Sequence, residues 1–264
     1  MSGAGRLEMI SAEQVIPFPT EWYPLSAVDH FWFEWRLAAA LGLAAEAGLD
    51  LRAPLRALDV GGGTGVLRDQ LEHVTAWTID LADLNRGALL AARPGRGRHL
   101  YYDIGEVRPE LAGSYDVVLL FDVLEHVEDT APFLRALVAH LKPGGTLLVN
   151  VPALPVLYGA YDVAAGHVRR YVPRTLRAEL EGSGLQVRET RYWGLSMVPV
   201  LLLRRVTQRS GTPAGELIRS GFQPPSPFVH AMLRRLARAE TRLLPRPPLG
   251  TSVLMAARAV PREK

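Results

Sequence analysis

The order of apolar and helical segments predicts an α/β protein with a doubly wound, mostly parallel sheet. Between residues 55 and 192, apolar runs of strand length alternate with stretches that repeat their apolar residues at helical spacing. Such alternation is typical of parallel strands joined by helices that cover both faces of a sheet. A last apolar run follows a long insertion and completes a seven-stranded sheet. The expected strands are 55–60, 74–80, 98–103, 115–121, 145–151, 185–192 and 251–258, and the expected core helices are 65–72, 83–92, 131–141 and 173–182.

The same pattern divides the 264 residues into four parts, of which the largest is a core over 51–192. Residues 1–50 are expected to form an arm, or a short helix, followed by a cap helix that begins in an aromatic cluster. Residues 193–249 are expected to form a helical insertion or lid, and 250–264 a closing strand and tail. A chain of this length is long enough for one large domain with an added lid.

Composition excludes several kinds of site. The chain has no cysteine, which rules out disulfides and thiolate metal sites. Its histidine, aspartate and glutamate residues are scattered without metal-ligand spacing, so we expect no metal. Residues 1–6 lack an apolar signal core, and we therefore expect a cytoplasmic protein.

The stretch Leu58–Gly65 reads L-D-V-G-G-G-T-G and joins an expected strand to an expected helix. Gly61, Gly63 and Gly65 have no Cβ, so the backbone can come close to a ligand there. Their spacing is G-x-G-x-G, whereas a dinucleotide site has G-x-G-x-x-G. Asp59 at the loop entrance would repel a pyrophosphate, but it suits a cationic ligand such as one that bears an amino group.

A second anchor is Asp80, which ends the next expected strand about twenty residues later, where a carboxylate can accept hydrogen bonds from both hydroxyls of a ribose. Three motifs follow in order: Y-D-I at 102–104, D-V-L-E-H at 122–126 and L-K-P-G-G at 141–145. With these motifs the chain resembles the class I S-adenosylmethionine-dependent methyltransferases, especially the quinone-biosynthesis-like enzymes that methylate small molecules. The resemblance covers roughly 29–187 and the closing strand. It implies a Rossmann-like fold that binds S-adenosylmethionine and releases S-adenosylhomocysteine.

The resemblance also implies roles for residues at the strand ends. Asp103 would accept a hydrogen bond from the adenine amino group, although its position also suits a helix N-cap. Ile104 would pack on the adenine ring, and Phe121 and Leu124 would line the other side of the cofactor. Arg36 in the cap helix would pair with the methionyl carboxylate. The expected cofactor-binding residues are therefore Arg36, Asp59, Gly61, Gly63, Gly65, Asp80, Leu81, Asp103, Ile104, Phe121 and Leu124.

The run D-x-x-x-G-H-x-R-R-Y at 162–171 borders the acceptor pocket in the enzymes that the chain resembles. His167 in this run is the expected general base, because an imidazole titrates near neutral pH and can take a hydroxyl proton. The alternative is that His167 and Arg170 only tie the loop to the sheet. Glu125 has the character of a surface charge. The expected substrate-binding residues are His126, Tyr158, Tyr161, Arg170, Tyr171 and Trp193.

These features predict methyl transfer from S-adenosylmethionine to a small-molecule acceptor, with a hydroxyl of an apolar or natural-product-like secondary metabolite as the favoured target. Transfer to carbon or nitrogen is the alternative. Residues 186–264 carry 14 basic and 4 acidic side chains, which raises RNA methylation as a rival function. No N-P-P-Y or D-P-P-Y motif of base methylases is present, and we expect no nucleic-acid partner. A cofactor-binding module without catalysis is a third class.

The insertion contains two apolar segments. Trp193–Leu203 is almost wholly apolar, but eleven residues cannot span a bilayer, which requires about twenty. Phe228–Leu244 carries an apolar stripe and separate arginines, a pattern that suits an anionic membrane surface or packing on the protein's own domain. Prolines near the middle of the insertion predict a joint suited to a lid, and we expect a monomer or a homodimer. The prolines are Pro213, Pro224, Pro225 and Pro227.

Overall fold

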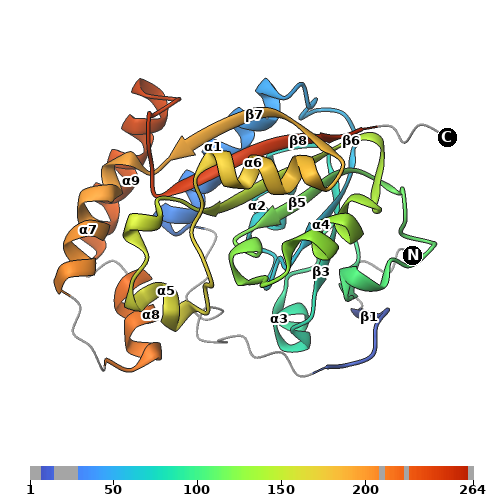
Figure 1. Ribbon diagram of the computed structural model, residues 1–264, viewed down its shortest axis with the longest axis horizontal. Helices are drawn as coiled ribbons and strands as arrows, with labels where there is room; N and C mark the ends of the chain where they lie inside the picture. Colours follow the sequence, from blue (N-terminus) through green and yellow to red (C-terminus); the bar gives the residue numbers. More distant parts are fainter. Residues whose placement is uncertain (1–6, 15–28, 208–211, 223–225, 261–264) are drawn as a thin grey trace.

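The computed structural model describes residues 7–14, 29–207, 212–222 and 226–260. These residues form one eight-stranded sheet in the order β1-β4-β3-β2-β5-β6-β8-β7 (Figure 1). Its strand pairs are parallel except for those of β8, which runs antiparallel to β6 and β7. The doubly wound, mostly parallel α/β prediction is therefore confirmed. The strands are β1 Leu7–Met9, β2 Arg56–Val60, β3 Thr78–Asp83, β4 His99–Tyr101, β5 Tyr115–Phe121, β6 Leu141–Pro152, β7 Leu185–Trp193 and β8 Ser252–Ala259.

Helices cover both faces of the sheet (Figure 1). In the central strand β5, Leu120 joins an apolar cluster with Leu134 of one helix layer, whereas Leu119 joins a cluster with Leu67 of the other. Because successive strand residues point to opposite faces, both faces of β5 are apolar and buried. The helices are α1 Phe31–Glu46, α2 Val66–Val74, α3 Arg86–Ala91, α4 Thr130–Val138, α5 Ala160–Ala165, α6 Pro173–Gly182, α7 Val198–Thr207, α8 Ala214–Phe222 and α9 Pro227–Leu243.

The predicted strand count of seven is wrong by one, because the N-terminal arm supplies an eighth strand. Leu7–Met9 pairs in parallel with β4, with Leu7 opposite His99. This pairing covers an edge of the sheet that would otherwise present unpaired backbone groups. Three residues are too few for an alternating pattern to be recognised in the sequence.

The position of β3 also differs from the prediction of 74–80. Helix α2 continues to Val74, so the strand begins later, at Thr78. It then continues past Asp80, because Ala82 pairs with Val60 at the end of β2. Asp80 therefore lies inside the strand, and the carboxylate at the strand's end is Asp83.

The predicted insertion contains α7, α8 and α9, which gather at one end of the molecule (Figure 1). Helix α9 packs against α1, where Ala237 is buried and Arg234 donates a hydrogen bond to Glu34. Helix α9 therefore packs on its own domain, and it also exposes apolar residues to solvent. No helix in the described part of the chain is long and apolar enough to cross a bilayer.

Parts of the predicted arm, joint and tail fall outside the described residues. These parts are residues 1–6, 15–28 and 261–264 and the prolines Pro224 and Pro225. Of the other two prolines of the joint, Pro213 lies just before α8 and Pro227 is the first residue of α9.

Glu240 of α9 fixes the start of the insertion. Its carboxylate accepts hydrogen bonds from the backbone N–H groups of Gly194, Leu195 and Ser196 at 3.0, 2.9 and 2.8 Å. Three donors on one carboxylate form a strong anchor, because hydrogen bonds to charged groups exceed neutral ones in strength.

We expect Glu240→Ala to lower the free energy of unfolding by about 1.5–3 kcal/mol, since it leaves these backbone donors without their acceptor. Urea denaturation followed by circular dichroism measures this loss. The matched control is Glu110→Ala, which removes an exposed carboxylate and should change stability little. Equal effects of the two substitutions would show that Glu240 does not anchor the insertion.

Candidate functional site

A cavity of about 680 Å³ lies at the carboxyl ends of β2, β3, β4 and β5. This is the place where ligands bind in doubly wound sheets. The arm, α1, the loop after β6 and α7 contribute further walls. Eleven of the predicted site residues line it: Arg36, Asp59, Gly61, Gly63, Asp103, Ile104, Phe121, His126, Tyr161, His167 and Arg170.

Asp80 does not reach this cavity, which corrects its predicted place. Its carboxylate is buried in the sheet, where it pairs with Arg98 at 2.9 Å and Arg56 at 3.1 Å and accepts the Tyr115 hydroxyl at 2.9 Å. Three partners in a buried setting indicate a structural role. Its neighbour Leu81 is also fully buried and lies outside the cavity wall.

Asp83 occupies the place that the sequence assigned to Asp80. It lines the cavity and accepts hydrogen bonds from the backbone N–H groups of Gly63 at 2.8 Å and Asn85 at 2.7 Å. The signal for this position was present in the sequence, because the apolar pair Leu81 and Ala82 continues the strand to a second carboxylate.

Five other predicted residues also lie outside the cavity wall. Gly65 caps α2 in a left-handed conformation, and Leu124 and Tyr171 are buried in the core. Trp193 is buried and donates its indole N–H to Asn150 at 2.9 Å. Tyr158 contacts a residue of the wall instead, because its hydroxyl donates to the backbone carbonyl of His167 at 2.8 Å.

Two glycines of the loop have no room for a side chain. Gly61 has a φ of 69°, and a Cβ there would lie 2.5 Å from a methyl carbon of Val123. A Cβ on Gly62 would lie 2.6 Å from a carboxylate oxygen of Asp59. The loop therefore brings bare backbone to the cavity, as a nucleoside-type ligand requires.

Asp59 is the unusual charge beside this loop. It is 1% exposed, and its Oδ2 has no hydrogen-bond partner among the described residues. Burial raises the pKa of Asp59 to about 7, although Arg36 and Arg68 oppose the shift. A buried carboxylate with an open lone pair suits a cationic ligand group.

Arg36 lines the cavity but is already paired. Its Nη1 donates to Asp122 Oδ2 at 2.6 Å, and Asn150 donates to the other oxygen at 2.5 Å. Asp122 holds an uncommon φ of 58°, which these two hydrogen bonds support. Its Nε has no hydrogen-bond partner among the described residues, so Arg36 can hold Asp122 and still donate to a ligand carboxylate.

Asp103 also has protein partners. Its Oδ1 accepts from the backbone N–H of Gly105, which is the helix-capping role that the sequence left open. Its Oδ2 accepts from the Gln14 side chain at 3.0 Å. The arm and β4 therefore meet at the cavity edge, beside Ile104.

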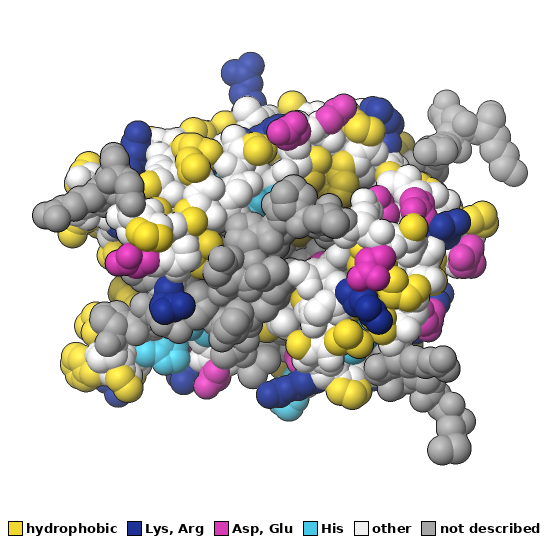
Figure 2. Space-filling model, turned by 90° about the horizontal axis from the view of Figure 1, so that it is seen from below, with side chains coloured by type: hydrophobic (Ala, Val, Ile, Leu, Met, Phe, Trp, Pro, Cys, Tyr) yellow, Lys and Arg dark blue, Asp and Glu magenta, His cyan; other side chains and the backbone are white. Residues whose placement is uncertain are grey.

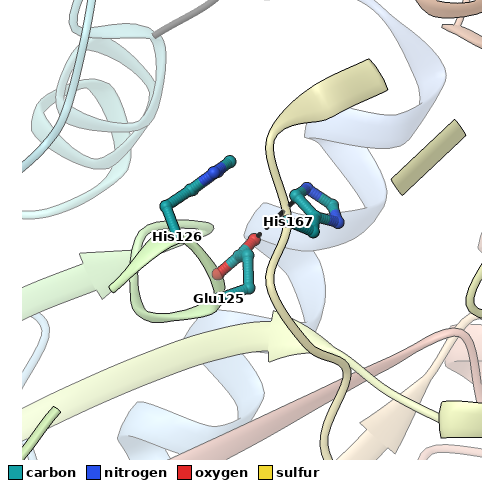
Figure 3. A group of neighbouring side chains, drawn as sticks. All are labelled: Glu125, His126 and His167. Atoms are coloured by element: carbon teal, nitrogen blue, oxygen red, sulfur yellow. Dashed lines mark ion pairs between the residues drawn. The ribbon is translucent and has the colours of Figure 1, made fainter. Parts of the chain in front are cut away.

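Glu125, His126 and His167 also line the cavity and lie next to one another (Figure 3). Glu125 is 1% exposed, so its predicted character as a surface charge is wrong. Burial, and then the nearby Asp122 carboxylate, raise the pKa of Glu125 well above its usual value. Burial and the neighbouring His167 lower the pKa of His126 to about 4.

These three side chains also form a group that could hold a metal ion. One potential ligand atom of each lies within 4.8 Å of the others. Figure 3 shows that Glu125 and His126 come from the turn after β5 and His167 from a separate segment. This set has no metal-ligand spacing along the sequence, because its members meet only in the folded chain.

His167 is oriented by Asp162. Its Nδ1 lies 2.9 Å from Asp162 Oδ1, while its Nε2 lies 3.9 Å from Glu125 Oε1. The same Asp162 oxygen accepts from Arg170 Nε at 2.8 Å. Although burial opposes ionisation, the His167 hydrogen bond and the Arg170 charge hold the pKa of Asp162 below its usual value.

The local sequence places this pair. Asp162 is in the first turn of α5, and its second oxygen accepts the backbone N–H of Gly159 just before the helix. Gly166 ends α5 in a left-handed conformation and turns the chain so that His167 folds back on Asp162. Asp162 is the first residue of the D-x-x-x-G-H-x-R-R-Y run, but the sequence analysis assigned it no role as the partner of His167.

The chain is similar to known methyltransferases in sequence and in fold. A methyltransferase domain model matches residues 29–190. The ubiquinone biosynthesis O-methyltransferases of Marinobacter nauticus and Xanthomonas axonopodis pv. citri are 33% and 32% identical over 154 and 156 residues. These matches cover 51% and 52% of this chain and 65% of each relative, which is less than two thirds of their length.

A solved structure gives the same fold. The Burkholderia thailandensis 1,6-didemethyltoxoflavin-N1-methyltransferase, solved with its acceptor and S-adenosylhomocysteine, superposes with a TM-score of 0.52 at 19% identity. The superposition covers 87% of this chain and 80% of that chain. At this identity the likeness concerns the fold alone.

The raised pKa of Asp59 gives a pH test. If a ligand amino group binds ionised Asp59, the dissociation constant of S-adenosylhomocysteine should be about tenfold higher at pH 6 than at pH 8, because a group with a pKa of about 7 is mostly protonated at pH 6. Isothermal titration calorimetry measures this ratio. Asp59→Asn should weaken binding at pH 8 and remove the dependence. A constant affinity of the native protein from pH 6 to 8 would contradict the role of Asp59.

Proposed function

Because the chain belongs to the methyltransferase domain family, we propose that it transfers a methyl group from S-adenosylmethionine to a hydroxyl of a small-molecule acceptor. The observation that carries this proposal is the His167–Asp162 pair on the cavity wall. A histidine with one ring nitrogen held by a carboxylate presents the other as a base.

The residues beside the glycine loop fit the cofactor. Gly61 and Gly63 line the cavity with positive φ and no side chain, and Asp83, at the end of β3, suits the ribose hydroxyls. Ile104 and Phe121 line the cavity where an adenine would need apolar faces. Asp59 suits the amino group of the methionyl part. When bound, the cofactor supplies an electrophilic methyl group.

His167 would remove the proton of the acceptor hydroxyl. Asp162 accepts from Nδ1, which leaves Nε2 as the basic nitrogen and stabilises the imidazolium that forms. The acceptor oxygen then bonds to the methyl carbon while the methyl–sulfur bond breaks, and the sulfur keeps the electron pair in S-adenosylhomocysteine. The protein contributes alignment and exclusion of water. Tyr158 supports this by tying the backbone of His167.

Oxygen is the proposed target because the matched relatives bear the name of O-methyltransferases. Transfer to nitrogen is the second candidate, because the solved neighbour is named an N-methyltransferase. The two differ in their need for a base, since an amine with a free electron pair can attack without losing its proton first.

We expect His167→Ala to reduce turnover by a factor of 10² to 10⁴, the usual contribution of a general base. The affinity for S-adenosylhomocysteine should stay unchanged, because the residues proposed to hold the cofactor, Asp59, Gly61 and Asp83, do not include His167. Methyl transfer from labelled S-adenosylmethionine to a cell extract measures turnover. His73→Ala, at an exposed position of α2, is the control. Unchanged turnover in His167→Ala would remove the base from the mechanism and favour transfer to nitrogen.

We also propose that the insertion contacts an anionic membrane surface. Large apolar side chains of α7 and α9 are exposed, including Val206 at 78%, Phe228 at 78% and Leu243 at 80%. Figure 2 shows apolar side chains at the end of the molecule that carries these helices. Exposed arginines of α9 lie among them, which suits anionic headgroups.

Vesicle sedimentation tests this contact. We expect the native protein to bind vesicles that contain phosphatidylserine. The double substitution Phe228→Ser and Leu243→Ser should weaken this binding at least tenfold, because it removes two apolar side chains that the membrane would bury. Leu90→Ser removes an exposed apolar residue of α3, outside the insertion, and should bind like the native protein. Absence of vesicle binding together with concentration-dependent dimerisation would assign these helices to a homodimer interface instead.

A further inference from the structure

Helix α7 of the insertion adds arginines to the wall of the cavity, at the end where the acceptor is expected. Arg204 of α7 lines the cavity together with Met197 and Leu201. The same end is bordered by Tyr161 and His167 from the loop after β6. The predicted substrate residues therefore meet a residue of the insertion that the sequence had not singled out.

Arg204 is held over the ring of Tyr161. The guanidinium carbon lies 3.8 Å from the ring centroid. Burial raises the pKa of the Tyr161 phenol, so that it keeps its proton at neutral pH. The ring thus supports the guanidinium and fixes its place, but it does not neutralise the positive charge.

Arginines outnumber carboxylates at this end of the cavity. Arg170, Arg204 and Arg205 line it together with Asp162 and Glu125, and Arg170 pairs with Asp162 at 2.8 Å. Positive charge is therefore in excess there even when both carboxylates are ionised. Burial lowers the pKa of Arg204, while its contact with Tyr161 and the Asp162 charge oppose that shift.

We propose that Arg204 binds an anionic group of the acceptor, a carboxylate or a phosphate, and so makes the acceptor an anion. Guanidinium groups match the geometry of both anions. Met197 and Leu201 would contact the apolar body of the same molecule, which leaves its hydroxyl to His167. This inference rests on the proposed function, since it describes what that reaction methylates.

The experiment separates a metabolite extract of the source cells into anionic and non-anionic pools by anion exchange. Each pool is incubated with the protein and methyl-labelled S-adenosylmethionine. Label should enter the anionic pool and stay on the anion exchanger after reaction. Prior treatment of that pool with alkaline phosphatase distinguishes the sources, because it abolishes labelling of a phosphate monoester and spares a carboxylate.

Variants assign the charge recognition to Arg204. With limiting anionic pool, Arg204→Gln should lower the initial rate at least tenfold, and Arg204→Lys should restore most of it. Both variants should bind S-adenosylhomocysteine like the native protein in calorimetry. Arg188→Gln removes an exposed arginine of β7 far from the cavity lining and serves as the control.

The outcomes are distinct. Label confined to the non-anionic pool would overturn the anionic acceptor while leaving methyl transfer intact. Weaker cofactor binding in Arg204→Gln would place Arg204 at the cofactor and also overturn it. Label in neither pool would contradict the proposed function itself, together with this inference.

Discussion

Asp162, at 1% exposure, ties together the start of α5, the loop that follows this helix and the arginine of the next segment. Its carboxylate accepts from the Gly159 backbone, the His167 ring and the Arg170 side chain. A buried carboxylate is costly unless its lone pairs are satisfied, so these three groups are held in one arrangement. The orientation of His167, and with it the shape of the acceptor end, depends on this carboxylate. A loop has thereby gained the rigidity that a reactive side chain needs.

A second set of contacts connects the insertion to the sheet and to α1. Trp193, at the end of β7, donates to Asn150, which donates to Asp122, which in turn pairs with Arg36 of α1. Glu240 fixes the chain just after Trp193. The first helix, the sheet and the insertion thus meet through buried polar contacts rather than through apolar packing alone. Such contacts require specific geometry, which favours one position of the insertion over others.

The fold and the glycine loop could be predicted because local chemistry decides them. Gly61 needs its positive φ and has no room for a Cβ, which the glycine spacing already indicated. Which of Asp80 and Asp83 reaches the cavity is not decided by the neighbouring sequence, since it depends on where β3 stops pairing with β2. Burial of Glu125 and the entry of Arg204 into the cavity depend on segments distant in sequence. In the sequence, both residues therefore resemble ordinary surface charges.

The position of β8 has a consequence for how the chain is made. In the sheet order, β7 has β8 as its neighbour, yet β8 follows it by about sixty residues. During synthesis at roughly 5–20 residues per second, β7 must wait on the order of 3–12 s for its partner to appear. Over that interval its backbone groups and the neighbouring edge of β6 stay open to wrong pairings. The late strand therefore lengthens the time in which β6 and β7 can pair wrongly, and slower translation is expected to lengthen it further.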